Sequence, residues 1–312
     1  MGGEDSAVKQ WTWEIALKGV IPPIITPLGV GGEIDTAAFD KVIEHVLVGG
    51  CSGLFALGTT GEGAWLTAAQ RRTVVCATVA ASRGRVPVLA GILQPGAALA
   101  REAAQQAEAD GADALVVGSP YYSSAEPDDQ RRHVEAVLAA VDLPVMLYNI
   151  PSCTHHAILP DTAATLANEP RVIGIKDSAG DRDAFMSFLA IKRRHPRFRV
   201  LLGDGALMVA ERPLPADGLV PGPANIVPHL YVALHKARVA GDTTTWRRVA
   251  TELLEIDRII QLANPTRIIK AACGILGLGN GDPAPPHAPL DPLQQQAIAV
   301  VVRRYSLEAQ RA

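Results

Sequence analysis

The sequence predicts an α/β fold, a (β/α)8 TIM barrel followed by a C-terminal helical extension. Short apolar runs rich in β-branched residues alternate along the chain with amphipathic or Ala-rich segments. Eight such runs precede residue 242, and most of them start about 30 residues apart, the length of one βα unit. Eight consecutive units indicate a closed barrel rather than an open doubly wound sheet.

This pattern places the individual elements. The strands are expected at residues 20–25, 53–57, 86–90, 114–117, 145–149, 172–176, 200–202 and 218–220. Helices are expected between them at 36–48, 67–82, 97–109, 128–140, 160–168, 181–194 and 205–211. Strand 114–117 is apolar throughout, which is typical of a parallel sheet covered on both faces. No Gly-x-Gly-x-x-Gly follows the first strand, which argues against a dinucleotide-binding domain.

Three regions follow from the same pattern. Residues 1–18 show no clear period and are expected to form an N-terminal arm, while residues 19–242 form the barrel and carry the active site. Residues 243–312 form a helical region, with helices at 246–262, 265–276 and 292–307 and a Gly/Pro-rich loop at 277–292. We expect this helical region to contact other subunits.

Composition and charge exclude several classes of protein. Of the 312 residues, 48% are hydrophobic and 20% are charged, which is an ordinary globular balance. The net charge of -3 is spread over interspersed acids and bases, so no nucleic-acid partner is expected. The longest apolar stretches run to about ten residues, too short for a membrane span. The four cysteines share no CxxC spacing, so we expect free thiols in the cytoplasm rather than a zinc site.

One lysine stands out among the seven of the chain. Lys176 alone closes a predicted buried strand, and the carboxyl ends of barrel strands are where active sites form. Burial lowers the pKa of an amine from its usual value of about 10.4 and so frees its lone pair for nucleophilic attack. A structural lysine paired with Asp177 is the alternative, but successive residues of a strand face opposite ways. Lys176 is therefore the predicted catalytic nucleophile.

Polar residues of other strands reach the same mouth of the barrel. Tyr148 lies one βα unit before Lys176, so its phenol can face the amine and transfer protons. A core tyrosine is the alternative. The segment Gly58-Thr59-Thr60-Gly61 follows the second strand and can hold a carboxylate with its amides and hydroxyls. An ordinary β-to-α turn is the alternative for this loop.

These segments, taken together, resemble one known family. The motifs are Gly58-Thr59-Thr60-Gly61-Glu62, Pro120-Tyr121-Tyr122, Tyr148-Asn149-Ile150-Pro151-Ser152 and Gly174-Ile175-Lys176-Asp177. In this order and on these strands they are similar to those of the dihydrodipicolinate synthase / N-acetylneuraminate lyase family, over residues 18–290. The resemblance implies a homo-oligomeric class I aldolase-type lyase, dimer or tetramer, with no metal and no organic cofactor.

The resemblance also implies a role for each residue at the mouth. Lys176 would form a Schiff base with C2 of pyruvate or a related 2-oxo acid, and Tyr148 would be the general acid and base. Thr59 would relay protons between Tyr148 and the Tyr122 of a neighbouring subunit. Thr60 would hold the substrate carboxylate within the loop from Gly58 to Gly61. The backbone carbonyl near Val220 would help to orient the substrate.

Two departures from the family patterns bear on the second substrate. Synthases of the lysine precursor carry an arginine where this chain has Cys153, and a thiol cannot replace a bidentate cation. Sialic-acid lyases carry acidic residues where this chain has Gly205 and Ala206. His155, close to Cys153, either binds a substrate hydroxyl or carboxylate or is an ordinary loop histidine. No third metal ligand is spaced near it.

The expected function is retro-aldol cleavage or dehydration of a 2-oxo-3-deoxy sugar acid or a related hydroxylated 2-oxo acid. One alternative within the family is 4-hydroxy-tetrahydrodipicolinate (dihydrodipicolinate) synthase, which condenses pyruvate with aspartate semialdehyde. An alternative of another class is a non-catalytic barrel that binds a 2-oxo acid. The set of Lys176, Tyr148, Thr59 and Tyr122 favours the enzyme, because a pure binder has no need of a proton relay.

Overall fold

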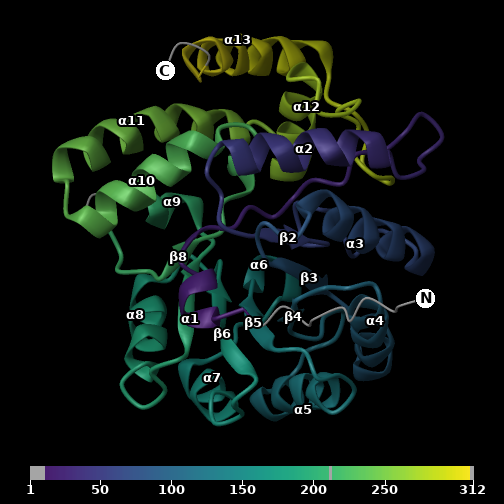
Figure 1. Ribbon diagram of the computed structural model, residues 1–312, viewed down its shortest axis with the longest axis vertical. Coiled ribbons are helices and arrows are strands. Elements are labelled where there is room, and N and C mark those ends of the chain that lie inside the picture. The colour runs from purple at the N-terminus through teal and green to yellow at the C-terminus, as the bar shows by residue number, and fades with distance from the viewer. Residues whose placement is uncertain (1–10, 211–212, 310–312) are drawn as a thin grey trace, which may run out of the picture.

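The computed structural model describes residues 11–210 and 213–309 of the chain. Most of the predicted N-terminal arm, residues 1–10, lies outside the described residues, as does position 211 at the end of the helix expected at 205–211. From Trp11 onward the chain runs through a barrel into a stack of C-terminal helices (Figure 1).

Eight parallel strands form one sheet in the order β1-β8-β7-β6-β5-β4-β3-β2. They are β1 (Gly19–Val20), β2 (Leu54–Ala56), β3 (Val88–Ile92), β4 (Ala114–Gly118), β5 (Val145–Asn149), β6 (Val172–Asp177), β7 (Arg199–Leu202) and β8 (Gly218–Leu219). The segment after β1 closes the sheet on β2, because Phe55 donates its amide to Pro22 at 3.0 Å and Ile24 donates to Phe55 at 2.9 Å. The predicted (β/α)8 TIM barrel with C-terminal helices is confirmed.

Helices of the chain surround this barrel on its outer side (Figure 1). They are α2 (Thr36–Val48), α3 (Ala68–Ser82), α4 (Ala97–Ala109), α5 (Pro127–Leu138), α7 (Pro160–Leu166), α8 (Arg182–Ile191) and α10 (Pro228–Ala240), with shorter turns α1 (Trp13–Ala16), α6 (Pro151–Thr154), α9 (Gly205–Met208) and η1 (Gly222–Asn225) between strands. Capping side chains stabilise the starts of two of them: Asp35 accepts from the Ala38 amide at the start of α2, and Thr67 forms a capping box with Gln70 at the start of α3.

One barrel helix, α10, was missing from the prediction. It begins with Pro228 in its first turn and ends at Gly241, whose φ of 70° is the left-handed conformation that favours glycine. Both signals stand in the sequence. The buried side chains of Leu230, Tyr231 and Leu234 pack the helix against the barrel, so it completes the ring of helices.

Prolines shift two strands from their predicted positions. The first strand, expected at 20–25, is regular only over Gly19–Val20, because Pro22 and Pro23 have no amide hydrogen for a ladder. The third strand, expected at 86–90, begins at Val88, directly after Pro87. Neither shift changes the order of the strands.

The barrel encloses its own apolar core, separate from the layer between strands and helices. It is formed by Leu17, Ile21, Phe55, Leu89, Ala114, Val116, Met146, Tyr148, Ile150, Ile173, Leu201 and Val220. Trp13 and Leu17, from the short helix α1 and the residue after it, close this core at the end where the strands begin. The segment expected to be a plain arm therefore contributes to the barrel core from Trp13 onward.

A β-bulge in β6 sets the direction of the Lys176 side chain. Val145 of β5 pairs with Val172, but Met146 pairs with Gly174, so Ile173 is the extra residue. Ile173 joins the inner core, and the register then brings Lys176 opposite Tyr148. Gly174 is required here, because a Cβ at this position would overlap the Arg199 carbonyl oxygen.

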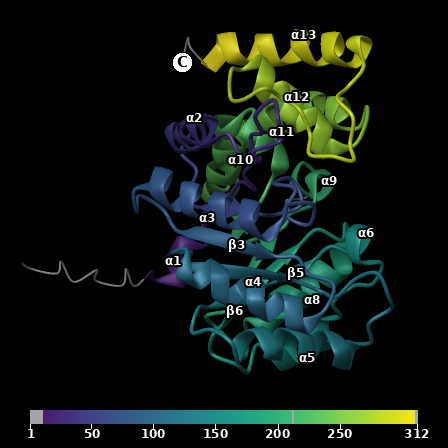
Figure 2. The same ribbon diagram turned by 90° about the vertical axis from the view of Figure 1, so that its right-hand side faces the viewer.

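The C-terminal region stacks on one side of the barrel (Figure 2). It contains α11 (Thr243–Ile260), α12 (Pro265–Ile275) and α13 (Pro292–Ala309), of which α11 packs against α10 and α12 packs against η1. Helix α13 lies outermost, and the buried Tyr305 hydroxyl donates to Glu255 of α11 at 3.0 Å. Over the residues that the structure describes, no helix combines the length and the apolarity that crossing a bilayer requires.

We predict that Gly91→Ala destabilises the protein by about 1–3 kcal/mol. A methyl group at Gly91 would overlap the carbonyl of Leu57, and Leu57 itself has a strained φ of 58° at the start of the loop after β2. The matched control is Gly205→Ala, whose methyl group would meet Asp257 at an ordinary 3.4 Å. Urea unfolding measures both variants, and equal stability of the two would contradict the close packing inferred at Gly91.

Candidate active site

The Lys176 side chain lies inside the mouth of the barrel with 4% of its surface exposed. Its amine is 4.0 Å from the ring centre of Tyr148 and 4.8 Å from that of Phe55. Among the described residues, no carboxylate lies within ion-pair distance of it. Burial lowers the pKa of Lys176 to about 7, and only the nearby Cys153 opposes the shift. At neutral pH a large fraction of this amine is therefore an uncharged nucleophile.

Asp177 does not neutralise Lys176, although it is the next residue. Its carboxylate accepts a hydrogen bond of 2.6 Å from the side-chain amide of Asn149, which lies on the neighbouring strand β5. Asn149 in turn accepts from the backbone amide of Ile158 at 2.9 Å. Burial raises the pKa of Asp177 to about 6, against the opposing effect of Asn149. The two side chains tie β5 to β6 just below the mouth and leave the amine unpaired.

Tyr148 lies next to this amine, and Thr59 is hydrogen-bonded to Tyr148. The Tyr148 hydroxyl and the Thr59 Oγ1 are 3.3 Å apart, and either can be the donor. Burial raises the pKa of Tyr148, while hydrogen bonds with Thr59 and Ser178 act in the opposite direction. The phenol therefore holds its proton at neutral pH and can give it up only to a group that forms during a reaction.

The loop after β2 passes across the mouth of the barrel. Thr59 and Thr60 are half-buried, and Gly58 and Gly61 are buried. The Thr60 hydroxyl lies close to Gly222, where an added Cβ would come within 3.1 Å of it. Thr60 thus faces Gly222, in the segment that follows β8. Val220, two residues before Gly222, places its side chain in the inner core of the barrel.

A cavity of about 260 Å³ opens beside Thr59. Its wall is formed by Thr59, Glu62, Gly63, Ala64, Trp65, Leu93, Gly118, Ser119, Tyr121, Ile150, Cys153 and Thr154. This wall contains no lysine, arginine or histidine. The cavity can therefore accept a small molecule, but it offers no side-chain cation to a second carboxylate.

Two of the predicted site residues lie elsewhere on the single chain. Tyr122 is 97% exposed, with a left-handed φ of 82°, and His155 is exposed with a φ of 67°. Both line a second hollow, together with Ser123, Ser124, Ala125, Glu126, Pro127, Gln130, His156, Ala157 and Leu159. Within one chain they are not part of the cavity beside Thr59.

The chain as a whole, from the barrel through the C-terminal helices, matches known proteins over most of its length. A family model described as the dihydrodipicolinate synthetase family matches residues 16–305. The chain belongs to the dihydrodipicolinate synthetase family. It is a lyase of the pyruvate-dependent, class I aldolase type, as the sequence predicts.

Individual relatives span most of the chain. It is 34% identical over 300 residues to a 4-hydroxy-tetrahydrodipicolinate synthase of Sorangium cellulosum, covering 96% of this chain and 98% of the relative. It is 32% identical over 263 residues to the probable 2-dehydro-3-deoxy-D-pentonate aldolase YjhH of Escherichia coli, covering 83% and 87%. Among solved structures, YagE of E. coli K12, a prophage protein in complex with pyruvate, superimposes with a TM-score of 0.86 at 32% identity, covering 93% of this chain and 99% of YagE.

Three residues around the Lys176 amine were not predicted from the sequence. Phe55 contacts the Lys176 amine from β2, and Ser178 bonds to the Tyr148 hydroxyl. A Cβ on Gly203 would overlap the Ser178 hydroxyl and lie 3.0 Å from the Lys176 Cε, so only glycine leaves room here. The sequence did contain one signal, because Ser178 stands two residues after Lys176, just past the end of β6, and side chains two residues apart on an extended chain point the same way.

The reactivity of Lys176 should follow a titration centred near pH 7. Below this pH the ammonium form dominates, so the rate of acetylation by acetic anhydride should fall about tenfold per pH unit. Above it the rate should level off. Peptide mapping measures the rate at Lys176, and free Nα-acetyl-lysine, with its usual pKa of about 10.4, is the control. A midpoint at Lys176 near that of the control would mean that the amine is charged at neutral pH.

Proposed function

We propose that Lys176 of this family member forms a Schiff base with a 2-oxo acid and that the enzyme cleaves or dehydrates a hydroxylated substrate of the 2-oxo-3-deoxy sugar acid class. The observation that carries the proposal is the Lys176 amine, without a carboxylate partner among the described residues, over the ring of Tyr148, whose hydroxyl is bonded to Thr59. A barrel that only bound a 2-oxo acid would have no need of a proton relay formed by the Tyr148 and Thr59 hydroxyls. The free cysteines of the chain would stay reduced in the cytoplasm, where we place the enzyme.

The retro-aldol reaction can be written with these groups alone. The Lys176 lone pair attacks the C2 carbonyl, and the resulting carbinolamine loses its hydroxyl as water when the Tyr148 phenol donates a proton. The Tyr148 phenolate then takes the proton of the C4 hydroxyl, and the C3–C4 bond breaks into an aldehyde and an enamine on Lys176. Protonation of the enamine at C3 and addition of water to C2 release pyruvate and restore the amine.

The carboxylate of the 2-oxo acid would bind at the loop after β2. The Thr60 hydroxyl and the backbone amides between Gly58 and Gly61 are the donors at the mouth, and carboxylates bind well to such clusters of amides. The carbonyl near Val220 would lie on the other side of the substrate. These contacts would place C2 within reach of Lys176.

The composition of the cavity wall supports a second reactant without a carboxylate. Cys153 stands where the resemblance to lysine-precursor synthases would require an arginine. The wall of the cavity contains no cationic side chain that could take the place of that arginine. The name of the relative YjhH, a probable pentonate aldolase, agrees with a hydroxylated substrate. The name of the Sorangium cellulosum relative supports the second candidate, 4-hydroxy-tetrahydrodipicolinate synthase. His155 would then have to bind the semialdehyde carboxylate from the neighbouring hollow.

We also propose that the enzyme is a homo-oligomer, dimer or tetramer, in which Tyr122 completes the site of a neighbouring subunit. Tyr122 is a large side chain held almost fully in solvent by a strained backbone. Such a conformation costs about 1–3 kcal/mol and usually persists for a function. In an oligomer its phenol would meet the Thr59 hydroxyl of the adjacent chain.

Tyr148→Phe should leave the Schiff base measurable but slow turnover by about 10²–10⁴-fold, the usual effect of losing a general acid and base. A direct readout is the exchange of the C3 hydrogens of pyruvate in D2O, followed by NMR, which needs no second substrate. Tyr305→Phe is the control, because it also removes a buried phenol, one that donates to Glu255 in the C-terminal helices. Exchange at the wild-type rate in Tyr148→Phe would make Tyr148 a core residue.

Cys153→Arg should shift the preference of the enzyme towards aspartate semialdehyde. A charge-assisted contact to the added carboxylate is worth about 1.5–3 kcal/mol, so kcat/KM for the semialdehyde should rise about 10- to 100-fold. The value for a 2-oxo-3-deoxy sugar acid should fall or stay constant. If the wild type already condenses the semialdehyde faster than it cleaves any sugar acid, the second candidate function is the correct one.

A further inference from the structure

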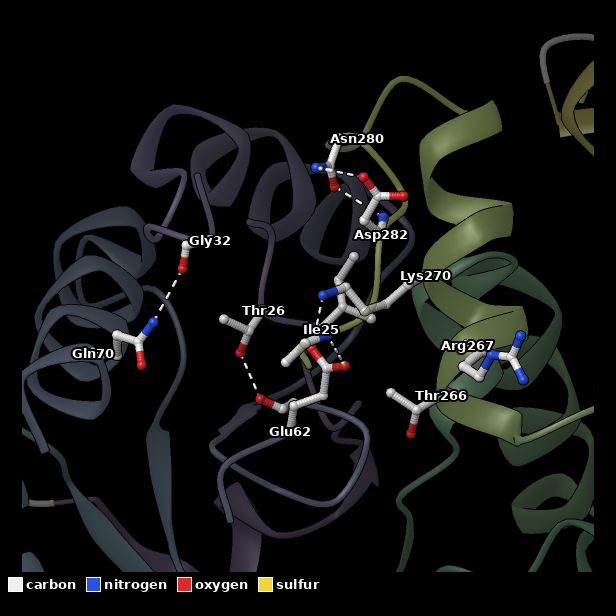
Figure 3. Close-up of polar contacts among 12 residues, drawn as sticks. Ile25, Thr26, Gly32, Glu62, Gln70, Thr266, Arg267, Lys270, Asn280 and Asp282 are labelled. Atoms are coloured by element: carbon white, nitrogen blue, oxygen red, sulfur yellow. Dashed lines mark hydrogen bonds and ion pairs between the residues drawn. The ribbon is translucent and has the colours of Figure 1, made fainter. Parts of the chain in front are cut away.

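A second buried lysine lies behind the active-site loop, and it differs from Lys176 in having an acidic partner. Lys270 of α12 donates to the Glu62 carboxylate at 2.7 Å, and the two side chains are 1% and 0% exposed. The partners are 208 residues apart in the chain. Figure 3 shows the pair between the loop after β2 and the C-terminal helices. Burial lowers the pKa of Lys270, but Glu62 and Asp282 oppose the shift.

Glu62 is anchored at more than one point. Its other carboxylate oxygen accepts from the backbone amide of Ala284 at 2.7 Å, in the Gly/Pro-rich loop after α12. The preceding carbonyl, that of Gly61, accepts from the Thr26 hydroxyl at 2.6 Å. The end of the active-site loop is thus fixed from three segments, the one after β1, helix α12 and the loop that follows it.

The backbone of Glu62 explains why such anchoring is needed. Its φ of 58° lies in the left-handed region, which is unfavourable for a residue with a side chain and which glycine adopts freely. A glycine at this position would relieve the strain but would have no carboxylate for Lys270 and Ala284. The side-chain contacts therefore hold the loop in a conformation that its own backbone does not favour.

We propose that the buried Glu62–Lys270 ion pair is a positioning pair for the Schiff-base reaction, through which the C-terminal helical region sets the Thr59 and Thr60 hydroxyls relative to Tyr148 and the substrate carboxylate. This inference rests on the function proposed above. Glu62 donates its amide to the Thr59 carbonyl at 3.1 Å, so a displaced Glu62 displaces Thr59. An error of about 1 Å in such a group can cost a hundredfold in rate.

Stability alone is a weak reason for this ion pair. Removing two charges from water costs about as much as their attraction returns, so an apolar pair of similar volume often gives equal stability. An apolar pair forms no directional hydrogen bonds. It therefore cannot fix the position of residue 62 as the Glu62 carboxylate does, by bonding to both the Lys270 amine and the Ala284 amide. The two explanations therefore predict different behaviour of an apolar replacement.

The test replaces both partners at once, with Glu62→Met and Lys270→Met, so that no buried charge is left unpaired. We expect the variant to fold and to be labelled at Lys176 by borohydride with saturating pyruvate. The pyruvate concentration that gives half-maximal labelling should rise about tenfold or more, and C3 exchange in D2O should slow by at least as much. Glu62→Gln with Lys270→Gln restores a hydrogen-bonded neutral pair. This variant should return the half-maximal pyruvate concentration and the C3 exchange rate most of the way to their wild-type values.

The matched control is the Lys192–Asp217 pair at the opposite end of the barrel. Asp217 also accepts from a lysine, at 2.6 Å, and from a backbone amide, that of Val200 at 2.9 Å. Lys192→Met with Asp217→Leu should lower the melting temperature without changing the pyruvate dependence or the exchange rate. An equal effect in this control would make the result one of general stability and would overturn the proposal.

The remaining outcomes separate this inference from the proposed function. Wild-type half-saturation and exchange in the Met–Met variant would overturn the positioning role alone, whereas an unlabelled wild type would overturn the Schiff-base function itself. If the Met–Met variant does not fold, Glu62→Gln with Lys270→Met takes its place, because it keeps an acceptor for the Ala284 amide. Its half-maximal pyruvate concentration should then exceed that of the Gln–Gln variant about tenfold or more. Equal values in the two variants would overturn the positioning role.

Discussion

The proposed chemistry depends on one constraint, the burial of the Lys176 amine without an anion beside it among the described residues. Lys176 projects from β6 into an apolar barrel interior, and the phenol and phenyl rings of Tyr148 and Phe55 are its neighbours. The cost of burying the ammonium form lowers the pKa of the lysine to about 7. A strand bulge, a glycine opposite the side chain and the pairing of Asp177 with Asn149 all serve to maintain this environment.

A comparison of the two buried lysines shows how the same side chain serves two purposes. Lys270 is as deeply buried as Lys176, but its amine bonds to the Glu62 carboxylate and so joins α12 to the loop after β2. Lys176 has no such partner among the described residues, and the rings of Tyr148 and Phe55 lie against its amine. Burial alone therefore does not make a lysine a nucleophile. The absence of an acid in its reach is the second requirement.

The sequence predicted the fold, and it singled out Lys176 as the candidate nucleophile, because both inferences follow from the local period of the chain. The repeat of βα units placed Lys176 and Tyr148 at the ends of neighbouring strands, and the register confirms that they are opposite one another. The bulge at Ile173 and the bond of Glu62 to Lys270 were beyond such reasoning, since the first is an exception to alternation and the second joins residues 208 positions apart. Helix α10, by contrast, was missed although its Pro228 and Gly241 marked both of its ends.

The most direct test of this account is to locate the covalent product formed with pyruvate. The protein is treated with pyruvate and borohydride, digested and mapped by mass spectrometry, with Lys176 and Lys270 compared in the same digest. The account predicts one reduced pyruvate adduct per chain, at Lys176, and none at Lys270. Labelling of Lys270 or of an exposed lysine with Lys176 unmodified, or no labelling of the chain, would contradict it.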